Sequence, residues 1–86
     1  MSSLLQEKEE RHKVLAEFLL KDDKRVYIRT YRDDLFFGDI LFVGETRIEI
    51  QCFSPKSKAG KKFCIYWVEI DILREYMDRE EKKDGI

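Results

Sequence analysis

Tyr27, Arg29 and Tyr31 are spaced by two residues, so on an extended strand their side chains share one face. Aromatic rings offer nucleic-acid bases a surface for stacking, and an arginine adds a positive charge and a planar guanidinium group. Arg47, from a later strand, could join them. The spacing is compatible with a surface on which nucleic-acid bases stack. The alternative is that the two tyrosines pack against a neighbouring helix.

A second candidate surface is rich in lysine. Its segment contains Pro55 and Gly60, which are typical of loops. Four lysines fall within seven residues of it: Lys56, Lys58, Lys61 and Lys62. Flexible lysines bind phosphate groups with an affinity that depends on salt and not on base sequence. The segment therefore predicts either a contact with nucleic-acid phosphates or a solvated hairpin tip.

Trp67 is the third candidate, because it lies at a corner between two predicted strands. An exposed tryptophan at this corner could stack on a base or on a partner's side chain. A buried one would close one end of the barrel core. Both interpretations stay open at the level of the sequence.

The sequence offers little for catalysis. His12 is the only histidine, and its charged surroundings predict a solvated position. Cys52 and Cys64 do not have the spacing of a zinc site, and no glycine-rich phosphate loop or nucleophile elbow is present. We therefore expect no enzymatic activity, no catalytic residue, no metal, no cofactor and no small-molecule substrate.

The two cysteines also bear on the cellular compartment. A hairpin turn centred on Lys58 would place Cys52 opposite Cys64. They are then expected to be two buried thiols or, in a hyperthermophile, a disulfide. The chain shows no signal peptide and no transmembrane stretch, so we expect a cytoplasmic protein with no membrane partner.

Charged residues make up 41% of the chain and aromatic residues 13%, which predicts a folded core beneath a dense ionic surface. Such a surface suggests a thermophile. The net charge of −1 argues against a general nucleic-acid-coating protein. Residues 24–68, however, hold nine basic and five acidic groups, whereas acidic groups are in excess at both ends. A basic patch can therefore exist locally.

The elements that carry these residues follow from the hydrophobic period. Residues 4–21 contain no glycine or proline and predict a helix. We expect its second half to dock through an apolar stripe of four residues: Val14, Leu15, Phe18 and Leu19. Its first turns would stand in solvent or meet a partner through Leu4 and Leu5.

After the helix the period changes from 3.6 to 2, which predicts strands. Five are expected, over about 26–31, 35–43, 47–52, 62–66 and 68–76. A flat sheet of such strands would leave an apolar face exposed. We therefore predict a mainly β fold, an N-terminal helix followed by a strongly bent, five-stranded antiparallel small barrel. The domain would span residues 1–76, with the barrel at about 24–76, and residues 77–86 would form a charged flexible tail.

Two stretches resemble the motifs of the Sm-like protein family. The first motif is similar to residues 26–31, residues 35–41 with Gly38 two positions before Ile40, and residues 48–50. The second is similar to residues 63–66 and 70–73, joined by a short corner at 67–69. The resemblance covers residues 4 to about 76 and implies that the barrel is of the SH3-like or Sm-like kind. It implies a homo-oligomeric ring of six or seven subunits, in which the fourth strand of one subunit pairs with the fifth strand of the next.

The resemblance also implies that single-stranded, uridine-rich RNA binds around the pore. Members of the family place an Asp and an Asn in the turn between strands two and three, where this chain has Gly44-Glu45-Thr46-Arg47. They carry an Arg-Gly pair at the last corner, where this chain has Trp67-Val68-Glu69. The usual uridine-pocket residues are thus replaced here.

Three hypotheses remain open. The first is an Sm-like ring with a role in RNA metabolism that binds single-stranded RNA through Arg29, Arg47, Trp67 and the lysine segment. The second is a protein-interaction or assembly module with the same barrel and no RNA binding, which the near-neutral charge and the replaced pocket residues favour. The third is an SH3-like monomer that docks on a larger complex.

Overall fold

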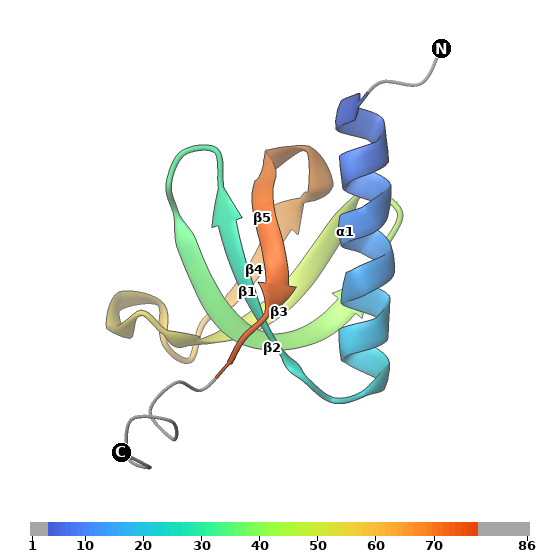
Figure 1. The fold of residues 1–86 in the computed structure, drawn as a ribbon. Coiled ribbons are helices and arrows are strands. Elements are labelled where there is room, and N and C mark those ends of the chain that lie inside the picture. Colours follow the sequence, from blue (N-terminus) through green and yellow to red (C-terminus); the bar gives the residue numbers. More distant parts are fainter. Residues whose placement is uncertain (1–3, 78–86) are drawn as a thin grey trace, which may run out of the picture.

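The computed structural model describes residues 4–77, with side chains from Glu7 onward. It consists of one helix, five strands and two short 3₁₀ turns (Figure 1). Their bounds are α1 (Leu4–Lys21), β1 (Arg25–Thr30), β2 (Leu35–Val43), β3 (Arg47–Ser54), η1 (Lys56–Lys58), β4 (Lys62–Tyr66), η2 (Trp67–Glu69) and β5 (Ile70–Glu75). The predicted fold class, a helix followed by a five-stranded antiparallel sheet, is confirmed. The predicted tail and the contacts expected of Leu4 and Leu5 lie outside the described residues and side chains.

The five strands form one antiparallel sheet in the order β4-β3-β2-β1-β5. β2 is the longest strand, and Figure 1 shows it curving around the molecule. Gly38 makes this curvature possible: a Cβ at this position would collide with the backbone of Gln51 on β3. The register between the two strands also shifts beside Gly38. A bend of this kind is where a glycine in a strand is expected.

The strands alternate between an inner and an outer face. On β1, Val26 and Ile28 are fully buried, whereas Tyr27 between them is only partly buried. The helix covers the inner face and contributes Ala16 and Leu19 to the same core. Inward-facing apolar residues of both layers therefore form one hydrophobic core, which provides the main driving force for folding.

The orientation of α1 differs from the sequence-based expectation. Val14 and Phe18 are 58% and 59% exposed, so only Leu15 and Leu19 of the predicted stripe face the core. The small Ala16 takes the central position instead and is completely buried. A short side chain here lets the helix lie close to the sheet. The helix is thus rotated relative to its apolar stripe, and part of that stripe stays uncovered.

Candidate nucleic-acid interface

Arg29 lies on the outer face of β1, as its alternation with buried residues predicts. Its guanidinium group binds the carboxylate of Asp33 in the following turn, with 2.7 Å from Nη2 and 3.1 Å from Nε to Oδ1. This hydrogen bond, together with the negative charge of Asp33, raises the pKa of Arg29. Asp33 therefore offsets part of the positive charge that Arg29 would offer to RNA.

Tyr31 follows β1 and is half exposed. Its hydroxyl oxygen accepts a hydrogen bond of 2.9 Å from Lys8 Nζ on α1, and the same ammonium lies 3.0 Å from the carboxylate of Asp71. The hydrogen bonds to Tyr31 and then Asp71 raise the pKa of Lys8. Tyr31 is thus held against the helix, as the alternative interpretation of the tyrosines predicted.

Tyr27 is held by the sheet and not by the helix. Its ring centre is 5.2 Å from that of Phe37 on β2, and the guanidinium carbon of Arg74 on β5 lies 4.6 Å from the centre of the Tyr27 ring. Both neighbours are direct cross-strand partners of Tyr27. Spacing along the sequence does not indicate Phe37 and Arg74, because only the strand register shows that they flank Tyr27.

Arg47 does not join Tyr27. It lies beside Gly44, beyond the end of β2, whereas the partner of Tyr27 is near the start of that strand. Its guanidinium group pairs with Glu49 at 3.0 Å and lies 5.4 Å from the centre of the Phe42 ring. The expected grouping of Arg47 with the β1 tyrosines is therefore wrong, since these residues lie at opposite ends of β2.

The lysine segment connects β3 to β4 and includes η1. Lys56, Lys61 and Lys62 are exposed, whereas Lys58 is half-buried, with its ammonium 4.9 Å from the centre of the Phe36 ring. Within residues 4–77, none of these four lysines forms a salt bridge. The three exposed lysines are thus not neutralised by a carboxylate of the described residues.

Trp67 is only 3% exposed, and its indole N–H donates a hydrogen bond to the carbonyl oxygen of Gly44 at 3.0 Å. Trp67 therefore belongs to the core, which agrees with the interpretation of a buried tryptophan. The RNA contact assigned to Trp67 is thus corrected: a buried ring with an occupied N–H cannot stack on a base.

The cysteines do not face each other. Cys52 lies opposite Lys61, whereas Cys64 lies opposite Glu49, which is three residues before Cys52 in β3. Cys52 is buried, which raises its pKa, and Cys64 is exposed. Both expectations, a disulfide and a pair of buried thiols, are therefore wrong. The turn is centred midway between Pro55 and Lys58, whereas the expected pairing of the cysteines required a centre at Lys58.

His12 is also placed differently from its prediction. It is half-buried where α1 meets the sheet, and its Nδ1 atom has no hydrogen-bond partner among the described residues. Burial is the main cause that lowers the pKa of His12, followed by the positive charges of Lys8 and Arg11, whereas Asp71 acts in the opposite direction. A solvated surface position is excluded, because the helix faces the sheet along this side.

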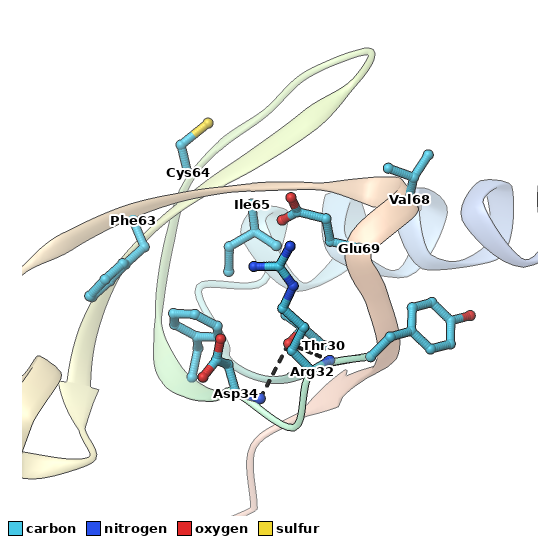
Figure 2. A pocket seen from close by; sticks show the side chains of 10 residues that line it. Thr30, Arg32, Asp34, Phe63, Cys64, Ile65, Val68 and Glu69 are labelled. Carbon is cyan, nitrogen blue, oxygen red and sulfur yellow. Dashed lines mark hydrogen bonds between the residues drawn. The ribbon is translucent and has the colours of Figure 1, made fainter.

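A pocket of about 280 Å³ lies between β4 and the turn that follows β1 (Figure 2). Phe63 and Ile65 form an apolar wall, and Figure 2 shows the side chain of Arg32 reaching into the pocket. The hydroxyl of Thr30 accepts hydrogen bonds from the backbone N–H groups of Arg32 and Asp34, which fixes the turn. Of the predicted RNA-binding residues, only Tyr31 lines this pocket.

Residues 4–77 contain no group of three or more His, Cys, Asp or Glu side chains that could hold a metal ion. Within the same residues, no helix combines the length and the apolar character needed to cross a membrane. No model of a known protein family matches this chain, and no curated protein matches it either.

Proposed function

We propose that this chain is an Sm-like, ring-forming cytoplasmic protein that binds single-stranded RNA in RNA metabolism. The observation that carries the proposal is the order of the sheet, which begins with β4 and ends with β5. Both edge strands leave backbone groups without partners inside the sheet, and such edges can pair with another chain.

The free edge of β4 can be deduced from its hydrogen bonds to β3. Cys52 N–H donates to the carbonyl of Lys61 on one side of β4, and Trp67 N–H donates to the carbonyl of Thr46 on the other. Backbone groups alternate in direction along an antiparallel strand. The N–H groups of Lys62, Cys64 and Tyr66 therefore point away from β3.

The same argument applies to β5. Tyr76 N–H donates to the carbonyl of Arg25, so that this residue and alternate residues of β5 face β1. Leu73 and Glu75 then direct their N–H groups away from the sheet. Because the two free edges are different surfaces, pairing of β4 with β5 of the next copy is head-to-tail, and it closes into a ring if the rotation allows.

RNA binding is supported by the lysine segment. Three of its four lysines are exposed, and none forms a salt bridge within residues 4–77. In a ring, each subunit would present one such segment. Repeated clusters of this kind neutralise successive phosphates, which gives an affinity that falls steeply as salt increases.

A proline at the β4 edge tests the assembly. In Cys64→Pro the outward N–H is removed, whereas the hydrogen bonds from β4 to β3 are kept. We expect the mass measured by light scattering to fall to that of single chains, with the circular dichroism unchanged. The control Cys64→Ala removes the thiol but keeps the N–H group, and it should retain the ring. A full-sized ring in Cys64→Pro would exclude the β4–β5 interface.

RNA binding is tested separately by fluorescence anisotropy with labelled oligo-U and oligo-A at several salt concentrations. We expect log K to fall linearly with log salt. Lys56→Gln, Lys61→Gln and Lys62→Gln in one chain should weaken binding and flatten that line. Undetectable or salt-insensitive binding would remove the RNA part of the proposal and leave the assembly part standing.

The exposed face of α1 favours a second candidate, an assembly module of the same fold without RNA binding. Val14 and Phe18 lie side by side on this helix and are more than half exposed. With Arg11, they border an open, almost wholly apolar groove. Apolar surfaces of this kind are typical of protein contacts. This candidate predicts an assembled protein with no RNA affinity, which the same titration detects.

A further inference from the structure

Four aromatic rings form a continuous row on the outer face of the sheet. The ring centres are 5.1 Å apart for Phe53 and Tyr76, 5.5 Å for Tyr76 and Phe37, and 5.2 Å for Phe37 and Tyr27. These side chains come from β3, from the residue after β5, from β2 and from β1. The row therefore crosses the sheet, and its position depends on strand register rather than on any local sequence motif.

An arginine lies over the ring at each end of the row. The guanidinium carbon of Arg25 is 4.5 Å from the centre of Phe53, and that of Arg74 is 4.6 Å from the centre of Tyr27. Guanidinium groups are planar, so they extend the stacking surface while their N–H groups remain able to donate. We call these six residues the aromatic platform: Arg25, Tyr27, Phe37, Phe53, Arg74 and Tyr76.

The platform is accessible. A groove of about 310 Å³ lies along part of it, lined by Tyr27, Phe37, Arg74, Glu75, Tyr76 and Met77. All four rings are only partly buried, and Arg74 is exposed. The inner face of the sheet is covered by α1, whereas no described element covers this outer groove.

The charges of the platform favour an anionic ligand. Arg74 forms no salt bridge within residues 4–77, and Arg25 has only a long one, 3.7 Å to Asp39. The nearby carboxylate of Glu75 is 3.7 Å from Lys24. Both guanidinium groups can therefore meet phosphates.

From these observations we infer that the aromatic platform is a base-stacking site for single-stranded RNA on the outer face of each subunit. This inference rests on the proposed RNA-binding function and assigns that function to residues the sequence did not indicate. Bases stack on the exposed parts of the rings, and Arg25 and Arg74 contact the phosphates on either side.

The lysine segment continues this path. Phe53, at one end of the row, is followed directly by Ser54 and then by the segment that carries Lys56. In Figure 1 the loop with η1 projects to the left, away from α1 on the right. A strand of RNA leaving the rings at Phe53 therefore meets lysines next.

A proline-rich peptide is the other ligand that docks on aromatic grooves. Its recognition relies on ring packing, and the peptide carries no charge that pairs with two guanidinium groups. The arginines at both ends of the row thus favour RNA. The peptide remains a distinguishable outcome of the test.

The test uses the full chain and labelled oligo-U and oligo-A in an anisotropy titration. Tyr76→Leu removes one of the two inner rings and keeps an apolar side chain. We expect its RNA affinity to fall about tenfold or more, the cost of losing one stacked base. Arg74→Gln should weaken binding and reduce the salt slope by about one, and Arg74→Lys should restore the slope but not the full affinity. Arg32→Gln removes the same charge far from the platform and is the matched control.

Light scattering and unfolding curves are recorded for every variant, so that loss of assembly or of the fold is seen directly. Weakened binding by Tyr76→Leu and Arg74→Gln with an unchanged mass, and little effect of Arg32→Gln, supports the platform. Unchanged binding in both platform variants, with binding lost in the lysine triple variant, overturns the platform but keeps the proposed function. If the unsubstituted protein binds no RNA, both fail. Binding of a proline-rich peptide that Tyr76→Leu abolishes would then assign the groove to peptides.

Discussion

The indole N–H of Trp67 donates a hydrogen bond to the carbonyl oxygen of Gly44, 3.0 Å away. The backbone N–H of Trp67 also bonds to the carbonyl of Thr46, at 3.1 Å. These two bonds tie the corner before β5 to the turn between β2 and β3. One buried side chain thus joins two segments that are more than twenty residues apart in the sequence.

Substitution of Trp67 should therefore destabilise the fold. Trp67→Phe keeps an aromatic ring but loses the hydrogen bond to Gly44, and we expect a loss of about 1–2 kcal/mol in the free energy of unfolding. Trp67→Ala also leaves a cavity and should cost about 3–5 kcal/mol. Urea unfolding followed by far-UV circular dichroism, at one fixed protein concentration, measures both. Equal stability of Trp67→Phe and the unsubstituted protein would show that the hydrogen bond contributes nothing.

Gly38→Ala should cost more than an ordinary glycine substitution. The added Cβ collides with the backbone of Gln51, which cannot move without breaking the pairing of β2 with β3. We expect about 2–3 kcal/mol or more, in the range of overpacked cores. Gly60→Ala is the control: nothing lies near its Cβ, and only its φ of 81° is unfavourable, which costs about 1 kcal/mol. A smaller loss for Gly38→Ala than for Gly60→Ala would contradict the close approach.

The stability should depend on the protonation of His12. Its pKa is lowered in the folded protein, so the unfolded chain binds the proton more tightly. The free energy of unfolding is therefore highest above the pKa of His12 in the unfolded chain, about 6.5. It decreases as the pH falls from there toward the lower pKa of His12 in the folded protein. Unfolding free energies at about pH 7.5 and pH 5.5 should therefore differ more for the unsubstituted protein than for His12→Gln. An NMR titration of His12 in the folded protein gives the pKa directly, and a value at or above 6.5 would contradict the buried site.

Cys52 and Cys64 should not form a disulfide within one chain. Their pairing partners on the hairpin differ by three positions, about 10 Å along a strand, whereas a disulfide needs Cα atoms within about 7 Å. After treatment with diamide, the mass of the denatured, unreduced chain should show both thiols still present. A mass lower by two hydrogens in a single chain would contradict the register.

Local patterns in the sequence were enough to predict the elements. The uninterrupted helix-forming run ending at Lys21 and the alternation of Val26 and Ile28 with Tyr27 depend only on neighbouring residues. The bend at Gly38 could also be predicted, because a glycine inside an apolar strand has few other uses. The fold class followed from the count and length of the strands.

Properties set by contacts between elements could not be predicted in this way. The rotation of α1 depends on which side chain fits closest to the sheet, and Ala16 fits where Phe18 does not. The exact hairpin register, with Cys52 opposite Lys61, depends on the 3₁₀ turn η1. The aromatic platform requires the positions of several strands at once, so spacing along one strand indicated only Tyr27.

The mass of the protein in solution tests the central claim most directly, since the proposed ring depends on pairing between the edges of β4 and β5. Native mass spectrometry of the purified protein, before and after nuclease treatment, reports the assembly and any bound RNA together. We predict six or seven times the 10.4 kDa of one chain, with additional mass that nuclease removes. A single chain of 10.4 kDa at micromolar concentration, with or without nuclease, would contradict the account.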